Sequence, residues 1–315
     1  MAVLIVQQAD DGRELKMQGK KIKIILYGIL LTLTLRLCFI NTETGIGLKM
    51  DKSENQTVAA WNFDSGIGIM ARMENARVKD KVLSDGQKKG YMDLYPDMYV
   101  ESIKPVIHLG EKKTAYLSFD DGPSHITNGI LDTLTEYEIK ATFFVLGCTI
   151  TREGEECLKD MVKQGHTIGI HTYSHNYKNI YSSVEAFLDD FYQDYLLIYE
   201  TTGVKVNIFR FPWGSYNSYN KNIRDELVAE MERRGFTYYD WNVSAEDSIG
   251  NPTEYRIKRN VLKDLDKYDN PIILMHDSSV NRLTAKTLPD ILESIIDKGY
   301  EFDTLDRRVP YQFGN

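Results

Sequence analysis

The stretch Thr114-Ala-Tyr-Leu-Ser-Phe-Asp-Asp-Gly-Pro123 decides the fold of this chain. Its opening residues are mostly apolar or small and have the composition of a buried strand. The glycine and proline at its end are turn formers, so two adjacent carboxylates, Asp120 and Asp121, are expected where the strand stops. On its own this string is also an ordinary turn, and its meaning depends on what surrounds it.

Strand-like and helix-like segments alternate on the carboxyl side of this stretch. From Val184 to Ile198, apolar residues recur at the i, i+3, i+4, i+7 spacing of a helix that faces a core. Repeated βα units predict parallel strands with helices outside them, and a β/α barrel gathers its catalytic groups at the strand ends. We predict strands at 114–119, 141–146, 167–170, 206–211, 236–239 and 271–275, and shorter helices at 127–137, 155–163, 223–233, 256–266 and 288–296.

The string His171-Thr-Tyr-Ser-His175 indicates a metal-binding site. Histidines at i and i+4 fall on the same side of a helical turn, close enough to bind one divalent metal ion. A carboxylate from the acidic pair would complete a His₂-Asp set with open positions for water and substrate, and the other carboxylate would remain free to accept a proton. A histidine pair alone is more often a surface pair, but the combination predicts metal-assisted hydrolysis.

Three further strings, 210–214, 240–247 and 273–277, stand where strands are expected to end. With them, the chain resembles the polysaccharide deacetylases, carbohydrate esterase family 4, over residues 111 to 306. Counterparts of all five family motifs occur in the family's order. Ser118-Phe-Asp-Asp-Gly-Pro-Ser124 is similar to the first motif, His171 to His175 to the second, Arg210-Phe-Pro-Trp213 to the third and Leu274-Met-His276 to the fifth.

The fourth motif departs from the family pattern. The family commonly shows D-[ST]-x-D-W, whereas this chain reads Ser244-Ala-Glu-Asp-Ser248. The second aspartate is present as Asp247, while serines replace the first aspartate and the tryptophan. The departure concerns the substrate groove more than the hydrolytic chemistry.

The resemblance implies a distorted (β/α)₇ barrel and a metal centre. Asp121, His171 and His175 would be the metal ligands, with Zn²⁺ the expected ion and Co²⁺ the alternative. Asp120 resembles the catalytic base that takes a proton from the attacking water. Arg210 would orient that carboxylate and keep it ionised.

The resemblance also assigns the acid and the substrate contacts. His276 resembles the general acid that protonates the leaving amine, and Asp247 would raise its pKa through a neighbouring negative charge. The backbone N–H of Trp213 would share the oxyanion of the intermediate with the metal. Pro212 and Leu274 would contact the substrate. Taken singly, Arg210, Asp247 and His276 are more readily explained by a salt bridge, a turn and a core histidine, and only the five ordered motifs together favour the catalytic roles.

Histidines and cysteines outside the motifs receive no catalytic role. His108, His125 and His166 are interpreted as structural or surface residues. Cys148 and Cys157 are close in sequence, and in an exported protein they can form a disulfide that closes the loop between a strand and a helix. The alternative is two free thiols.

Composition and the N-terminal segment bear on location. The net charge of −8 and the lack of a basic tract in the domain argue against a nucleic-acid partner. The apolar segment 24–40 follows several lysines, which predicts a single-pass membrane anchor after a basic cytoplasmic segment at 1–23. A cleaved signal peptide, and therefore a secreted protein, is the alternative. Residues 41–110 predict a polar stalk that packs on the domain only near 91–100, and 111–310 an extracellular catalytic domain.

The family resemblance then implies a metal-dependent N-deacetylase of N-acetylhexosamine in an extracellular glycan, with peptidoglycan as the first candidate. One alternative keeps the chemistry and changes the bond, namely O-deacetylation of xylan. Another is an inactive descendant that only binds carbohydrate. A Ser-His-Asp esterase is a poor candidate, because the chain has no Gly-x-Ser-x-Gly string.

Overall fold

The computed structural model describes residues 90–104 and 113–314. The predicted cytoplasmic segment 1–23, the apolar segment 24–40 and most of the predicted stalk lie outside the described residues. None of the helices in the described part of the chain is both long and apolar enough to span a bilayer.

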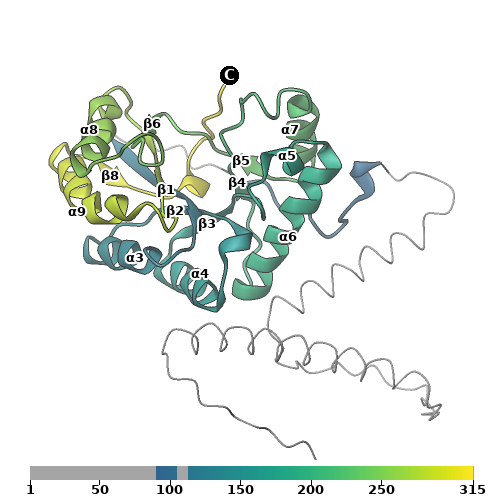
Figure 1. The fold of residues 1–315 in the computed structure, drawn as a ribbon, viewed down its shortest axis with the longest axis horizontal. Coiled ribbons are helices and arrows are strands. Elements are labelled where there is room, and N and C mark those ends of the chain that lie inside the picture. The colour runs from purple at the N-terminus through teal and green to yellow at the C-terminus, as the bar shows by residue number, and fades with distance from the viewer. Residues whose placement is uncertain (1–89, 105–112, 315) are drawn as a thin grey trace, which may run out of the picture. The chain divides into compact units, whose positions relative to one another are not determined.

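One parallel sheet forms the centre of the domain (Figure 1). Its strands follow the order β5-β4-β3-β2-β1-β7-β6, and β8 pairs with the start of β1. The predicted parallel α/β arrangement is therefore confirmed. The strands are β1 (Thr114–Gly122), β2 (Thr142–Val145), β3 (Thr167–Ile170), β4 (Ile208–Phe209), β5 (Thr237–Tyr238), β6 (Val243–Ser244), β7 (Ile272–His276) and β8 (Glu301–Phe302).

The sheet is open rather than a closed barrel. In the described residues β5 and β6 stand at the two ends of the strand order and are not paired with each other. The last described segment of the chain is hydrogen-bonded to Asp240, which lies just after β5. Asp240 N donates to Tyr311 O at 2.8 Å, and Phe313 N donates to the Asp240 carboxylate at 2.7 Å. These contacts satisfy backbone groups beside the gap that a neighbouring strand would otherwise satisfy.

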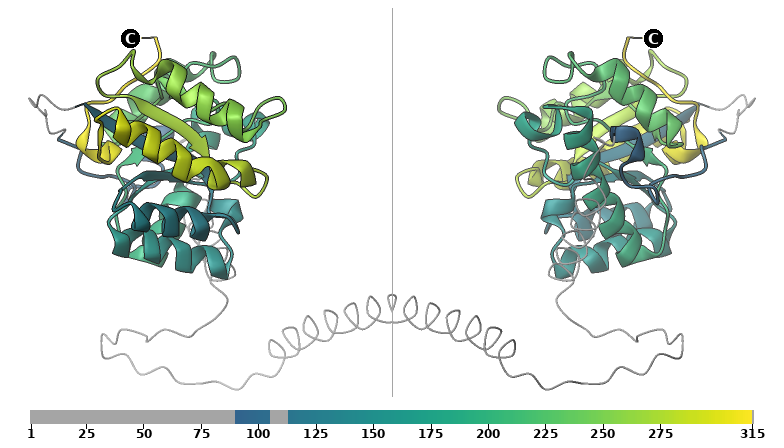
Figure 2. Two further views of the ribbon diagram at one scale, coloured as in Figure 1. Left: turned by 90° about the vertical axis from the view of Figure 1, so that its left-hand side faces the viewer. Right: turned by 90° about the vertical axis from the view of Figure 1, so that its right-hand side faces the viewer.

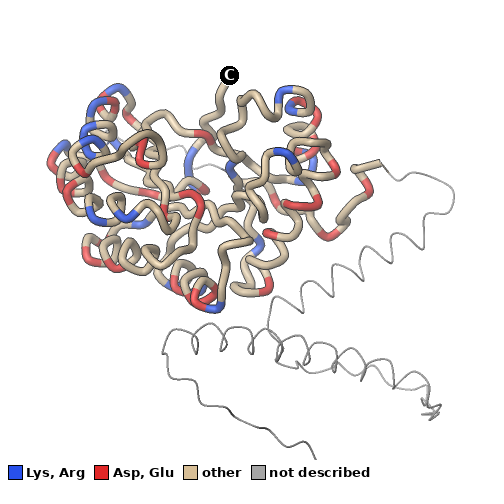
Figure 3. The backbone as a smooth tube through the Cα atoms, viewed as in Figure 1, with Lys and Arg blue, Asp and Glu red and all other residues tan. Residues whose placement is uncertain are grey.

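Helices cover the outer side of the sheet (Figure 1), and α8 packs beside α9 (Figure 2). Every apolar residue of the stripe predicted on α6 is buried, and Ser183 caps the start of that helix by accepting from Ala186 N. Acidic and basic residues are interspersed along the outer helices (Figure 3). The helices are α3 (Thr127–Glu136), α4 (Arg152–Gln164), α5 (Tyr177–Ile180), α6 (Val184–Thr202), α7 (Arg224–Arg233), α8 (Glu254–Leu265) and α9 (Arg282–Asp297).

A buried arginine fastens residues 91–100 to the domain. The side chain of Arg234 is fully buried, and its guanidinium donates to the backbone oxygens of Leu94 at 2.8 Å and Tyr95 at 3.1 Å. Its Nε donates to Glu230 at 2.7 Å. The fully buried Met98 belongs to the same hydrophobic core as the sheet. This part of the predicted stalk therefore packs as part of the domain.

Replacing Arg234 with methionine is expected to lower the free energy of unfolding by about 3–5 kcal/mol, because it leaves several backbone carbonyls without their donor and removes one of the two arginines that pair with the buried Glu230 carboxylate. Urea denaturation of the full chain measures the loss. Arg233→Met is the matched control: Arg233 also pairs with Glu230 at 2.7 Å, but 35% of its side chain is exposed, so a loss of about 1 kcal/mol or less is expected. Equal losses of unfolding free energy in the two variants would contradict the conclusion that Arg234 fastens residues 91–100 to the domain.

Candidate active site

A β-bulge at the end of β1 brings both members of the acidic pair to one place. Adjacent residues of a regular strand point to opposite faces of the sheet. The pairing of β1 with β2 shifts register between Asp120 and Gly122, and Asp121 has a left-handed backbone with φ of 72°. As a result His171 Nε2 lies 3.9 Å from Asp120 Oδ2 and 3.5 Å from Asp121 Oδ1.

Residue 122 of the bulge must be a glycine, because a buried carboxyl group lies against its backbone and leaves no room for a side chain. A Cβ at this position would overlap the side chain of Asp277. That carboxyl accepts from Thr127 Oγ1 at 2.8 Å, and burial, together with the charges of Asp121 and Asp120, raises its pKa to about 7. Sequence reasoning assigned no role to Asp277, although the residue directly follows the candidate acid His276 in the fifth motif.

The two motif histidines lie in a loop, and the prediction that they share a helical turn is wrong. His171 directly follows β3, and both Thr172 (φ 74°) and His175 (φ 51°) have left-handed backbones. These turns bring the imidazoles together without a helix, with His175 Nε2 3.7 Å from Asp121 Oδ1. The carboxylate of Asp190 holds the loop by accepting from two backbone N–H groups within it, at 2.7 and 3.0 Å.

The group Asp121, His171 and His175 fits a divalent metal ion. One ligand atom from each residue lies within 4.8 Å of the others. Asp121 Oδ1 is buried and has no hydrogen-bond partner among the described residues. His171 Nδ1 lies 3.0 Å from Arg210 O, which can only accept, so the ring proton is on Nδ1 and Nε2 is free to bind a metal. Burial, followed by the nearby His175, lowers the pKa of His171 to about 3, so the ring is neutral, as a ligand must be.

Arg210 is fully buried and holds the other carboxylate of the pair. Its Nη1 donates to Asp120 Oδ1 at 2.7 Å and to Ser118 Oγ at 2.9 Å, and its Nε donates to Tyr239 O at 2.9 Å. The guanidinium carbon lies 4.2 Å from the centroid of the Phe144 ring. These contacts fix Asp120 with one oxygen on Arg210 and the other facing His171.

His276 stands beside Asp120 on the neighbouring strand. The two residues are register partners in the pairing of β1 with β7, so their side chains share a face of the sheet. His276 Nδ1 is 2.8 Å from Asp247 Oδ1. Burial would lower the pKa of His276, but the hydrogen bond and charge of Asp247, with smaller contributions from Asp120 and Asp121, raise it to about 9. The imidazole is therefore protonated at neutral pH.

The departures in the fourth motif have local hydrogen-bond partners. Ser244 Oγ accepts from Glu246 N at 3.1 Å, in the turn that leads to Asp247. Ser248 Oγ accepts from Asn281 Nδ2 at 3.1 Å. Both serines thus support the loop that carries the partner of His276.

The remaining predicted site residues lie around this centre. Trp213 has a left-handed backbone (φ 64°), and its ring centroid is 4.3 Å from that of His175. The carbonyl of Pro212 accepts from Tyr181 Oη at 2.9 Å. Since the N–H and C=O of a trans peptide point in opposite directions, this bond fixes the direction of the Trp213 N–H. Leu274 shares the inner face with His276 and is buried.

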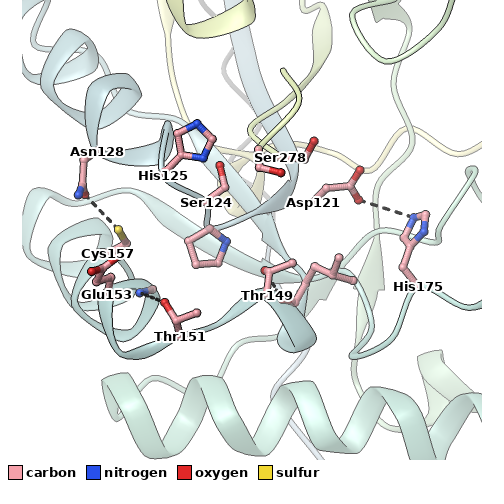
Figure 4. A pocket seen from close by; sticks show the side chains of 14 residues that line it. Asp121, Ser124, His125, Asn128, Thr149, Thr151, Glu153, Cys157, His175 and Ser278 are labelled. Carbon is pink, nitrogen blue, oxygen red and sulfur yellow. Dashed lines mark hydrogen bonds and ion pairs between the residues drawn. The ribbon is translucent and has the colours of Figure 1, made fainter. Parts of the chain in front are cut away.

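A cavity of about 450 Å³ adjoins the site (Figure 4). Asp121 and His175 lie at one end of it, and Asn128 and Cys157 at the other. His125, which sequence reasoning set aside, is among its lining residues. Much of the wall between the two ends consists of hydroxyl side chains, contributed by Ser124, Thr149, Thr151, Ser278 and Ser279.

Of the two alternatives for Cys148 and Cys157, the structure shows free thiols and no disulfide. Cys148 and Cys157 are both free, and the Cys157 thiol donates to Asn128 Oδ1 at 3.0 Å. The loop between them is held by its threonines instead. Thr149 Oγ1 donates to Leu146 O at 2.7 Å, and Thr151 caps α4 by accepting from Gly154 N. His166, as expected, is a core histidine whose pKa burial lowers to about 4.

Comparison with known proteins agrees with this geometry. The model of the family described as polysaccharide deacetylase matches residues 109–232. A peptidoglycan-N-acetylglucosamine deacetylase of Bacillus cereus is 33% identical over 198 residues, which cover 61% of this chain and 69% of that protein. The chain belongs to the polysaccharide deacetylase family.

Two further relatives of this deacetylase differ in the activities that their names state. A bifunctional xylanase/deacetylase of Pseudobutyrivibrio xylanivorans is 32% identical, over 62% of this chain and 30% of that protein. Among solved structures, the catalytic domain of a peptidoglycan N-acetylglucosamine deacetylase from Eubacterium rectale is 34% identical. The superposition covers 67% of this chain and 96% of that domain, with a TM-score of 0.62.

Proposed function

We propose that this deacetylase is a metal-dependent enzyme that removes N-acetyl groups from N-acetylhexosamine in an extracellular glycan, with peptidoglycan as the first candidate. The main support is the bulge at Asp121, which presents the Asp121 carboxylate to His171 and His175 while Arg210 holds the carboxylate of Asp120. The relatives that act on peptidoglycan support the substrate. The predicted anchor at 24–40 would keep the domain near a wall outside the membrane.

In this proposal Asp121, His171 and His175 would hold the metal, which would supply Lewis-acid polarisation and make a water molecule more acidic. Asp120 accepts the proton of the attacking water, because its Oδ2 faces the metal ligands while Arg210 occupies its Oδ1. The N–H of Trp213, fixed through the Pro212 carbonyl, donates to the oxyanion of the tetrahedral intermediate.

His276 then gives its proton to the leaving amine. Its Nδ1 proton is held by Asp247, so the proton on Nε2 is the one transferred. Asp247 is itself fixed by Thr284 Oγ1, which donates to its Oδ2 at 2.6 Å. Base and acid thus come from register partners on adjacent strands. We propose that Pro212, whose carbonyl accepts from Tyr181 Oη, and Leu274, which shares a face of the sheet with His276, contact the substrate.

Asp247→Asn is expected to move the alkaline limb of kcat/KM to lower pH. Asp247 opposes the lowering effect of burial on the pKa of His276, so without its charge the imidazole loses its proton at lower pH and stops acting as an acid. A pH profile of kcat/KM measures the shift. Glu246→Gln is the control, because it removes the charge of a neighbouring carboxylate that pairs with Lys263. Its alkaline limb should stay at the pH of the wild type. An unmoved limb in Asp247→Asn would rule out His276 as the titrating acid.

Acetate release by the metal-loaded full chain tests the substrate. The panel consists of peptidoglycan, N-acetylglucosamine oligomers and acetylated xylan. We expect release from the first two. Release of acetate from acetylated xylan alone would show that the enzyme cleaves an ester rather than an amide. Binding of glycans without release of acetate from any of them would indicate a binding protein.

A further inference from the structure

Three exposed aromatic side chains, which we call the aromatic shelf, extend outward from the candidate metal centre. They are Trp213, Tyr219 and Tyr177, with exposed fractions of 40%, 44% and 38%. The Trp213 ring packs on the candidate ligand His175, Tyr219 lies 5.2 Å from Trp213, and Tyr177 lies 4.4 Å from Tyr219 (centroid distances). The shelf is therefore a continuous aromatic surface that begins at the catalytic groups.

The shelf is built from two loops that already serve the site. Tyr177 begins α5, just after the histidine loop, and Tyr219 follows the third motif in the connection from β4 to α7. Asn217 supports this connection by donating to Gly214 O at 2.8 Å and accepting from Tyr219 N at 2.8 Å. Tyr219 is thus held in place while its ring remains accessible to solvent.

A contiguous exposed aromatic surface at a catalytic centre indicates a binding site rather than a part of the core. The chemistry of a glycan fits it: a pyranose ring has an apolar face of C–H groups that packs on an aromatic ring, while its hydroxyls stay at the edge in water. A polysaccharide also continues beyond the sugar that reacts. The neighbouring sugar must therefore cross one of the surfaces that border the metal centre.

We propose that the sugar next to the one being deacetylated stacks on Tyr177 and Tyr219. This inference rests on the proposed function, because it requires a glycan chain as the substrate. It assigns to these two tyrosines, which lie outside the five motifs, a specificity for chains over single sugars.

The test compares Tyr177→Ala and Tyr219→Ala with the wild type, as full-length, metal-loaded protein on N-acetylglucosamine and on its oligomers from dimer to pentamer. We expect kcat/KM on the oligomers to fall about tenfold in each variant, mainly through KM, since one lost aromatic stack corresponds to roughly that factor. The fall on N-acetylglucosamine itself, which has no neighbouring sugar, should be smaller. Tyr177→Phe and Tyr219→Phe keep the rings and should keep the wild-type dependence on length.

Tyr199→Ala is the matched control, since Tyr199 is 39% exposed but lies on α6, outside the shelf. It should leave kcat/KM unchanged at every length, and metal content should equal that of the wild type in all variants. Alanine variants that retain the wild-type dependence on length, or that lose activity equally at all lengths, would contradict the proposal that the neighbouring sugar stacks on the shelf. A wild type that releases no acetate from any oligomer or from peptidoglycan would instead overturn the proposed function.

Discussion

Asp120→Asn is expected to lower kcat by about 10³-fold while the protein keeps its metal, since positioned general bases contribute roughly 10²–10⁴-fold. The amide is nearly the same shape, and its oxygen can still accept from Arg210, whose Nη1 lies 2.7 Å from Asp120 Oδ1. What the amide cannot do is accept the proton of the attacking water. Acetate release under saturating substrate gives kcat, and elemental analysis of the purified protein gives the metal content.

Asp277→Asn provides a matched control for this variant. Asp277 is another buried carboxyl near the same bulge, but it bonds to Thr127, and its pKa of about 7 means that it is already partly neutral. Its amide should therefore keep kcat close to that of the wild type. Full activity in Asp120→Asn would rule out Asp120 as the base, and loss of metal from that variant would make it a ligand.

His171→Ala is expected to lose both metal and activity. Removing a residue that only orients a metal ligand typically weakens binding by about 10–100-fold, so removing one of three ligands should weaken it by more than about 100-fold. A chelator should likewise abolish the activity of the wild type, and added Zn²⁺ or Co²⁺ should restore it. The same addition should not restore His171→Ala.

His125→Ala is the control for the metal prediction, because His125 lines the adjoining cavity but is not one of the three candidate ligands. Its metal content should match that of the wild type. If His171→Ala retained a full equivalent of metal, the ligand assignment would be wrong. If the chelated wild type remained fully active, the metal would have no part in the reaction.

Local sequence patterns correctly predicted the longer strands and helices of the domain. The apolar composition of 114–119 belongs to β1, and the helical stripe of α6 is buried throughout, because these patterns reflect burial that each element needs wherever it packs. The motif residues were expected to meet because parallel strands end at the same edge of a sheet. The structure places Asp120, His276 and Arg210 together for this reason.

Features that depend on distant contacts could not be predicted in this way. The bulge at Asp121 packs against Asp277, which lies behind Gly122, and these residues are far apart in sequence. The i, i+4 spacing of His171 and His175 fits a helix and a turned loop equally well. The short strands β6 and β8 have two residues each, so they are defined by their partners β7 and β1 rather than by a pattern of their own.

The buried pair of Arg210 and Asp120 has a consequence for descendants of this protein. Arg210 also bonds to Tyr239 and Ser118, so its charge is placed at the centre of the sheet whether or not catalysis is needed. A lineage that lost only the carboxylate would keep a buried, unpaired cation, which costs about 3–5 kcal/mol. Selection for folding alone should then replace the arginine as well. Among homologues that lack the carboxylate, most should therefore lack the arginine as well.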